Sequence, residues 1–341
     1  MLGTFRLILA LAVALTHAGV TVAGRDPGVI AVVCFYLISG YVMTGLIRVH
    51  YGQPVQARHF YLDRALRLWP HYLVVAAITL AWFYLSGTRT YFLARTPTAT
   101  DFLNNLTILP FNYYMFNDAN RFVLVPTAWS LGAELQFYFI APLVVLTGGR
   151  ILVLAGSAAV FVLACFGYLN TEWYGYRLAA GVMFMFMIGS LLYDAHGSPG
   201  EPGRARTIIL WTTLSIVILA GVLAATGRLF RPFNPEVLLG LICGVPILHF
   251  LGRLPRRRWD VSLGDLAYGV FLNHLLIQLV LFTQVPVTPT TTAIYVVLSI
   301  VTACVLFHLV EKPIVKLRYA LRKAAVHASG NGARPGSQPD A

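Results

Sequence analysis

The chain has 341 residues, of which 58% are hydrophobic and 11% charged, and its mean hydropathy is +0.72. Soluble domains carry about a quarter charged residues, so this composition excludes an ordinary globular protein and indicates a polytopic membrane protein. The net charge of +12 does not predict a nucleic-acid partner, because the basic residues lie mostly in short segments between apolar runs.

Ten apolar runs approach the roughly 20 residues that a helix needs to span a bilayer. The expected spans are 5–24, 28–47, 70–87, 128–147, 151–168, 178–195, 207–226, 235–251, 262–282 and 291–310. An even number of spans places both termini on one side, which then holds 18 of the 25 Lys and Arg residues, against 7 on the other side. The positive-inside rule makes that side the cytoplasm. We therefore expect an all-α integral membrane protein with about ten transmembrane helices and both termini cytoplasmic.

Two features of the first span bear on function. Arg6 and His17 are eleven residues apart, which brings them to nearly the same face of a helix, roughly 16 Å apart along its axis. A histidine deep inside an apolar span costs free energy unless it faces a polar cavity, so His17 is a functional candidate, with a packing histidine as the alternative. The first 24 residues also have the outline of a secretory signal, but a second apolar run follows at once and favours an uncleaved span.

The segment RHFYLDRALRLWPHYL, residues 58–73, is expected to begin as a cytoplasmic loop before the third span. Arg64 and Arg67 share a face of a helical turn, and Arg58 lies about two turns earlier. Because guanidinium groups fit phosphate oxygens in a fork, these arginines form a plausible clamp for a phosphorylated cytosolic ligand. The alternative is that they bind anionic lipid and set the topology.

The next segment, residues 88–127, is too polar to cross the membrane and is expected to form either an interfacial loop or a lid. In the fourth span, Glu134 must be paired, protonated or facing water. Its candidate roles are to orient a histidine, to bind a sugar hydroxyl or to satisfy a helix end. Trp129 and Tyr138 nearby offer surfaces on which a sugar ring can stack, although an aromatic belt explains them equally well.

Towards the carboxyl end, His274 in the ninth span is a buried candidate, with a core histidine as the alternative. Glu311, Lys312 and Pro313 are expected to end the last span at the interface. Residues 323–341, rich in Gly, Ser, Pro and Ala, are predicted to be a disordered cytoplasmic tail. The four cysteines lie in apolar runs without metal-ligand spacing, so no metal site is predicted.

Four motifs in these segments follow one another in the order found in a known family. They are Arg6, ten residues and His17; Gly28 through Phe35, Tyr36, Leu37, Ile38, Ser39 and Gly40; Arg64, Arg67 and Pro70; and Trp129, Ser130, Leu131, Glu134, Phe137 and Tyr138. Together they resemble the acyltransferase-3 family of membrane-bound enzymes that acylate bacterial O-antigen, peptidoglycan, exopolysaccharide, Nod factors and macrolides. The resemblance runs from Arg6 to about Arg318, so residues 1–322 are expected to form one acyltransferase-3-like transmembrane domain.

The resemblance implies transfer of an acyl group, expected to be acetyl, from cytosolic acyl-CoA to a hydroxyl of a cell-surface or exported glycan or glycosylated metabolite. It places the protein in the bacterial inner membrane, among lipids, with acyl-CoA as a co-substrate and no permanently bound cofactor. It makes His17 the general base, or the site of a transient acyl group, with Glu134 as a second catalytic residue. The remaining roles are donor binding for Arg6, Arg58, Arg64 and Arg67, and acceptor or cavity contacts for Ser39, Trp129, Tyr138 and His274.

One position departs from the family pattern. Where the family usually carries Asp, two residues before the paired aromatics, this chain has Val33. The function of that carboxylate must be absent here or supplied by another residue such as Glu134. Two other classes of function stay open from the sequence: a secondary transporter of an anionic or glycosylated solute, and a non-catalytic partner of a polysaccharide-assembly complex.

Overall fold

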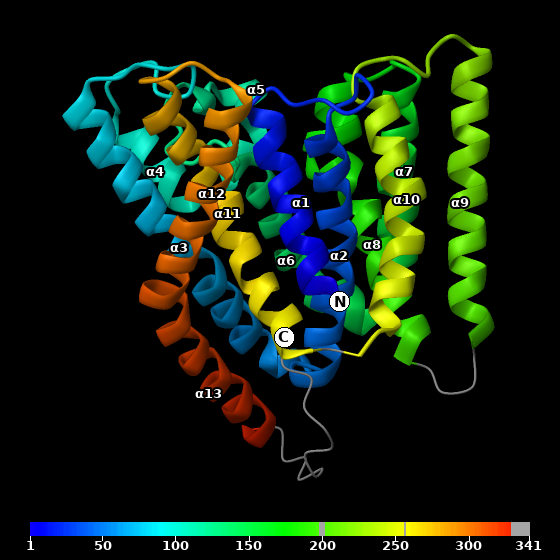
Figure 1. Cartoon of the computed structure of the whole chain (residues 1–341). Coiled ribbons are helices and arrows are strands. Elements are labelled where there is room, and N and C mark those ends of the chain that lie inside the picture. The colour runs from blue at the N-terminus through cyan, green and yellow to red at the C-terminus, as the bar shows by residue number, and fades with distance from the viewer. Residues whose placement is uncertain (198–201, 256, 329–341) are drawn as a thin grey trace.

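The computed structural model describes residues 1–197, 202–255 and 257–328, and all regular structure in these ranges is helical (Figure 1). The long helices are α1 (Leu2–His17), α2 (Pro27–His50), α3 (Ala57–Ser86), α6 (Ala128–Thr147), α7 (Arg150–Cys165), α8 (Ala179–Gly197), α9 (Pro202–Ala225), α10 (Asn234–Arg253), α11 (Arg258–Phe282), α12 (Pro289–Leu306) and α13 (Lys312–Ala328). The short helical segments are η1 (Pro54–Gln56), α4 (Ala99–Thr107), η2 (Leu109–Tyr113), α5 (Tyr114–Asn117), η3 (Ala119–Arg121), η4 (Trp173–Arg177) and η5 (Phe307–Glu311).

The helices confirm a polytopic membrane protein. Within the described residues, eight helical segments are long and apolar enough to cross a bilayer, and the shorter apolar helices α1 and α7 lie at the two remaining expected spans. Helix α1 begins and α13 ends at the same end of the bundle, which we call the basic end (Figure 1). Residues 18–26 and 88–127 lie at the opposite end, which we call the loop end. The count of ten spans and the cytoplasmic location of the basic end stay predictions.

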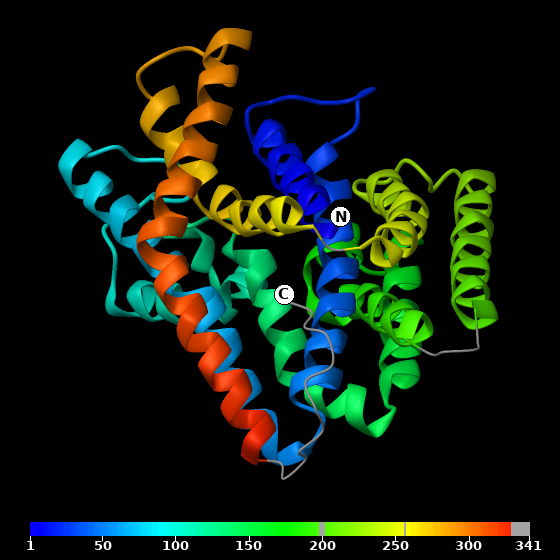
Figure 2. The ribbon, with the colours of Figure 1, turned by 60° about the horizontal axis from the view of Figure 1, so that its bottom comes forward.

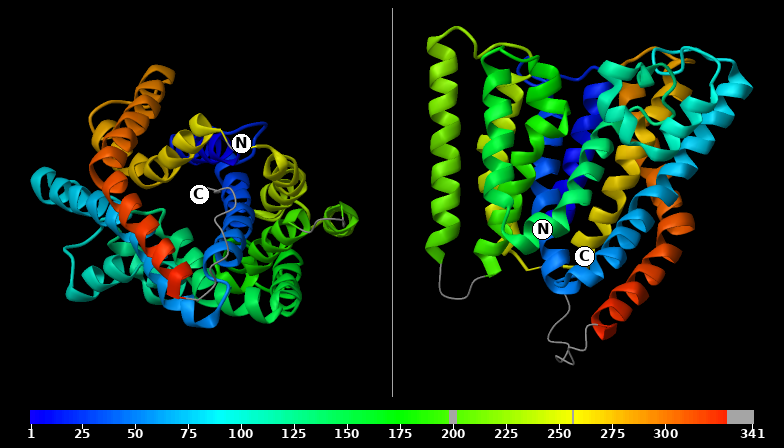
Figure 3. Two further views of the ribbon diagram at one scale, coloured as in Figure 1. Left: turned by 90° about the horizontal axis from the view of Figure 1, so that it is seen from below. Right: turned by 180° about the vertical axis from the view of Figure 1, so that it is seen from behind.

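Helix α2 is the buried centre of the bundle. Pro27 opens it, and the carboxylate of Asp26 caps it by accepting hydrogen bonds from the backbone N–H groups of Gly28 (2.8 Å) and Val29 (3.2 Å). The helix packs against α1, α6, α8 and α10. By contrast, α9 stands at the edge of the bundle and is exposed along most of its length, as expected for a helix that faces lipid (Figures 1 and 3).

The expectation that His17 lies deep inside a span over residues 5–24 is wrong. Helix α1 ends at His17, and Gly19 follows with φ +84°, a left-handed conformation that glycine adopts without steric cost and that stops the helix. His17 therefore lies at the loop end of α1, and Arg6 lies near the basic end. Residues 18–26 form the loop that connects α1 to α2.

The expected cytoplasmic loop before the third span is also wrong, because α3 is continuous from Ala57 to Ser86 with Pro70 inside it. The Arg, Leu and Ala residues between 57 and 68 are good helix formers, and they extend the span by three turns. Arg64 and Arg67 are consequently held on a rigid helix. Figure 2 shows that this part of α3 lies beside α13, which packs against it.

The last span continues beyond its expected end through η5 into α13. Pro313 does not stop the helix, because the π-helical turn η5 directly precedes it, so its missing N–H falls where the regular α-helical hydrogen bonds are already interrupted. Residues 323–328, expected to be disordered, belong to α13, since Lys and Ala favour helix. The rest of the expected tail, residues 329–341, lies outside the described residues.

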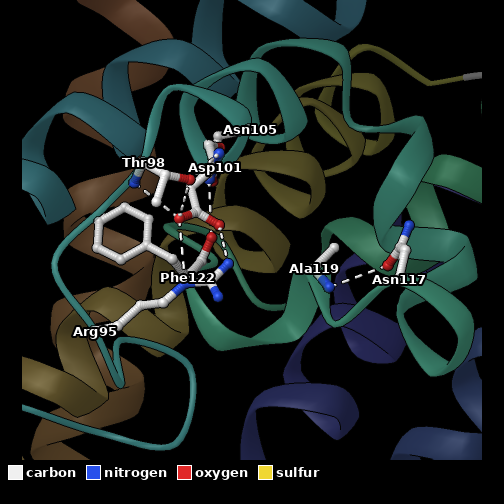
Figure 4. Close-up of polar contacts among 7 residues, drawn as sticks. All are labelled: Arg95, Thr98, Asp101, Asn105, Asn117, Ala119 and Phe122. Atoms are coloured by element: carbon white, nitrogen blue, oxygen red, sulfur yellow. Dashed lines mark hydrogen bonds and ion pairs between the residues drawn. The ribbon is translucent and has the colours of Figure 1, made fainter.

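Residues 88–127 do not cross the membrane but fold as a compact cap at the loop end (Figure 4). Thr98 and Asp101 form a capping box, in which the carboxylate of Asp101 accepts from Thr98 N–H (2.9 Å) and from the Arg95 guanidinium (2.7 Å). Asn105 donates to the carbonyl oxygen of Phe122 (3.0 Å) and thereby ties α4 to the end of the cap. Burial raises the pKa of Asp101, but the hydrogen bonds from Arg95 and Thr98 lower it by more, so its pKa lies below the ordinary 3.8.

Candidate active site

Two cavities lie on opposite sides of one thin wall. The basic cavity, about 240 Å³, is lined by residues of the basic end, and the loop cavity, about 360 Å³, is lined by residues of the loop end. Three residues line both: Val32 of α2, Ser130 of α6 and Phe271 of α11. We call these three shared residues, which come from three helices, the wall between the cavities.

The basic cavity is strongly positive. Its cations come from α1, α3 and α13, whereas its carboxylates are those of Glu134 and Asp265. The cationic residues are Arg6, Arg64, Arg67, Lys312, Arg318 and Arg322. Such an excess of positive charge within low-dielectric walls suits an anionic ligand. Lys312, Arg318 and Arg322 were not singled out from the sequence as binding residues, because only the packing of α13 against α3 brings them to the cavity.

Arg67 is held by a buried carboxylate from the far end of the chain. Glu311 forms an ion pair with Arg67 and accepts a hydrogen bond from His71 Nδ1 (2.5 Å). The Arg67 guanidinium also stacks on the ring of Tyr268, 4.9 Å from its centroid. The expectation that Glu311 marks a helix end at the interface is thus wrong, because it is buried as the partner of two groups on α3.

Glu134 joins two other predicted residues in the basic cavity. Its Oε1 accepts hydrogen bonds from Ser39 Oγ (2.6 Å) and from the hydroxyl of Tyr138 (2.7 Å). The Ser39 proton is therefore directed to a carboxylate. Gly40, the next residue, allows α2 to approach α8: a Cβ built on it would lie 1.9 Å from the carbonyl oxygen of Phe186, as expected for a close-packing glycine.

His17 lines the loop cavity, and its partner there is His274. His17 Nδ1 lies 3.1 Å from His274 Nε2, and His274 is completely buried behind it. The Nδ1 of each ring is close to a backbone carbonyl oxygen, Val13 at 2.9 Å for His17 and Val270 at 3.0 Å for His274. Because a carbonyl only accepts, we assign the proton of each neutral ring to Nδ1. His17 Nε2 is then an unprotonated nitrogen able to act as a base.

One side of the loop cavity is lined by aromatic rings that surround Arg177. The guanidinium of Arg177 lies 4.4 Å from the ring centroid of Trp129 and 5.5 Å from that of Tyr176, and its Nε donates to Glu172 (2.8 Å). Flat aromatic faces beside charged and polar groups suit a ring that carries several hydroxyls. Arg177 and Glu172 were not predicted from the sequence. The signal that could have found them is the segment EWYGYR, residues 172–177, directly before the sixth span.

The other predicted site residues divide between the cavities or lie outside both. Arg58 is exposed at the start of α3 and is not among the described residues that line the basic cavity. Glu134 and His17 line different cavities, and no hydrogen bond joins them in the described part of the chain, so His274 is the group that orients His17. Val33 is buried against Gly240 of α10, so the position of the family carboxylate here faces a helix.

The fold and the two cavities define a multi-pass membrane protein with a histidine at one cavity and an arginine cluster at the other, which is an arrangement suited to group transfer. A family model described as "Acyltransferase domain" matches residues 2–309, and the chain therefore belongs to the acyltransferase-3 family and is an O-acyltransferase.

Two relatives are similar to this chain. An uncharacterized protein of Aquifex aeolicus (strain VF5) is 30% identical over 207 residues, which cover 58% of this chain and 91% of that protein. The "Putative peptidoglycan O-acetyltransferase YrhL" of Bacillus subtilis (strain 168) is 24% identical over 326 residues, which cover 84% of this chain and 50% of YrhL. The chain thus spans about half the length of YrhL. No solved structure matches.

Proposed function

We propose that the protein transfers an acetyl group from cytosolic acetyl-CoA to a hydroxyl of a glycan on the other side of the bacterial inner membrane. The observation that carries this proposal is the pair of cavities that share the wall of Val32, Ser130 and Phe271. The positive cavity suits the phosphates of a CoA thioester, and the aromatic cavity with His17 suits a sugar. Membership of the acyltransferase-3 family favours this enzyme over the transporter and over the non-catalytic partner.

In this proposal the donor enters at the basic end. Arg64, Arg67 and Arg6 hold its phosphates, and the pantetheine arm extends past Ser39, Glu134 and Tyr138 to the wall. The thioester carbonyl passes the side chain of Phe271 to reach the loop cavity. Ser39 and Tyr138 keep Glu134 directed along this path, so Glu134 acts on the donor side and not on His17.

The chemical step follows from the tautomer of His17. Its Nε2 accepts the proton of an acceptor hydroxyl while the hydroxyl oxygen attacks the thioester carbonyl, and the C–S bond breaks as the tetrahedral intermediate collapses. The imidazolium then returns its proton to the departing thiolate, which leaves free CoA and an acetyl ester. Trp129 and Arg177 hold the acceptor ring beside His17. A positioned base of this kind contributes about 10²- to 10⁴-fold to the rate.

Kinetics of three variants test the proposal. The measurement is acetyl-CoA consumption by the detergent-purified protein in the presence of soluble peptidoglycan fragments. His17→Ala is expected to lower kcat about 10²-fold or more with little change in KM for acetyl-CoA. Arg64→Gln is expected to raise that KM while saturating acetyl-CoA restores turnover. Arg58→Gln, which removes an exposed arginine outside the cavity, is the control and leaves both constants unchanged. Unchanged turnover in His17→Ala would contradict the proposal.

A further inference from the structure

A buried carboxylate on α3 is surrounded by three arginines. Asp63 is completely buried and forms ion pairs with Arg64, with Arg318 (Nε to Oδ1, 3.1 Å) and with Arg322 (Nε to Oδ1, 3.3 Å). Arg64 follows Asp63 on α3, whereas the other two come from α13. All three arginine side chains are themselves buried, and all three line the basic cavity.

The charges of this cluster do not balance. Three guanidinium groups share the single carboxylate of Asp63, which leaves two positive charges in excess. The neighbouring carboxylate of Glu311 is already paired with Arg67 and so does not compensate them. The Nε of Arg322 is buried and has no hydrogen-bond partner of good geometry in the described part of the chain. Buried charge of one sign is costly, and an anion that enters the cavity removes that cost.

We infer that Arg64, Arg318 and Arg322 form a binding site for a phosphate dianion, and that α13 supplies two of the three arginines. Two negative charges match the excess of the cluster, and the planar guanidinium groups suit phosphate oxygens. If the bound phosphate is that of the acyl-CoA donor, this inference rests on the proposed function and specifies how the donor is held. The same phosphate monoester is the headgroup of phosphatidic acid, an anionic lipid. Asp63 does not contact the anion in either case, and its single negative charge offsets one of the three guanidinium charges.

Binding experiments separate this site from a merely structural cluster. The probe is CoA itself, titrated calorimetrically into the full chain in zwitterionic nanodiscs. Arg318→Gln combined with Arg322→Gln is expected to weaken the affinity for CoA at least about tenfold, because two charged partners of the phosphate are lost. Lys316→Gln, which removes an exposed charge from the same helix outside the cavity, leaves the affinity unchanged. Thermal melting verifies that each variant is folded.

The Asp63→Asn variant is expected to change the affinity for CoA in the direction opposite to the double arginine variant. It removes the only negative charge of the cluster and raises the positive excess, so CoA is expected to bind at least as tightly as to the wild type. A purely structural cluster predicts weaker binding in Asp63→Asn as well as in the double arginine variant, and that result would overturn the inference. Unchanged CoA and lipid binding in the folded double variant would overturn it too.

Two further binding experiments show whether the phosphate belongs to CoA or to a lipid. If the site binds the donor, the double variant loses affinity for CoA, and 3′-dephospho-CoA shows whether the 3′-phosphate is the group that is bound. If it binds lipid, phosphatidic acid in the nanodisc competes with CoA or binds in its place, and that binding is lost in the double variant. Arginine-dependent lipid binding without any CoA binding supports the site and contradicts the proposed function. If the wild type turns over acetyl-CoA and the double variant binds CoA and lipid as the wild type does, the phosphate site is contradicted but the proposed function is not.

Discussion

The imidazole of His17 owes its proposed reactivity to a second histidine 257 residues away in the sequence. Together with the carbonyl oxygen of Val13, the Nε2 of His274 accepts a hydrogen bond from His17 Nδ1–H, and His17 Nε2 stays free to act as a base. Replacing His274 with Leu removes the acceptor and is expected to lower kcat at least tenfold, by analogy with the larger losses seen when a base is held in the wrong tautomer. Replacing it with Gln, whose side-chain oxygen can accept, restores part of the loss. Equal kcat and equal pH–rate profiles in the Leu, Gln and wild-type proteins would contradict this role.

Asp101 in the loop-end cap gives a prediction about pH. Its pKa is lowered in the folded protein, so its contribution to stability is complete above the unfolded pKa of about 3.9 and is lost as the pH falls through the lower folded value. At pH 7, Asp101→Asn is expected to destabilise the protein by about 1 kcal/mol, a small effect because Arg95 is partly exposed.

The Tm difference between wild type and Asp101→Asn should therefore be present at pH 7 and shrink towards pH 3. Differential scanning fluorimetry of the detergent-solubilised protein measures it. Asp118→Asn, an exposed carboxylate in the same cap, is the control and leaves Tm unchanged at both pH values. A Tm difference for Asp101→Asn that stays constant over this range would show that the charge of Asp101 does not stabilise the cap.

Helices α2 and α8 approach each other through two glycines. A Cβ built on Gly40 would lie 1.9 Å from the carbonyl oxygen of Phe186, and one on Gly189 would lie 1.9 Å from that of Leu37. Because the obstacle is backbone on both sides, the helices must separate to admit a side chain. Gly40→Leu is expected to destabilise the protein by about 3 kcal/mol or more and to displace Ser39 from Glu134.

Thermal melting and acetyl-CoA turnover of Gly40→Leu test this packing. Gly156→Ala on α7 is the control, since a Cβ there meets nothing within 4 Å and Ala favours helix, so it should lower neither Tm nor activity. A Gly40→Leu variant with wild-type Tm and activity would show that α2 and α8 do not need this close approach.

The helices illustrate how far sequence alone specifies this fold. Hydropathy placed α6 at residues 128–147 and predicted the other apolar helices to within several residues at most ends, because lipid imposes length and composition directly. It missed the first three turns of α3 and the whole of α13, where Arg and Lys lower the hydropathy without disfavouring helix. Charged helices that pack against other helices lack the signal on which such predictions depend.

The two cavities were harder to predict than the residues that line them. Arg6, Arg64, His17 and Glu134 were candidates from the sequence, but their division between opposite sides of a wall was not. The groups that complete each site, His274 behind His17 and Arg318 beside Asp63, come from more than 250 residues away. Only tertiary packing brings them there, so spacing in the sequence carries no signal for them.

The proposed function requires transfer from one side of the membrane to the other, so the sidedness of the two substrates is its most direct test. The measurement uses proteoliposomes with acetyl-CoA and a soluble peptidoglycan fragment placed on the same side or on opposite sides of the membrane. Acetylated fragment is expected when the two substrates are separated by the bilayer, little when they share one side, and none in either case with His17→Ala. Transfer at full rate between substrates that share one side, with no product across the membrane, would contradict the proposed function.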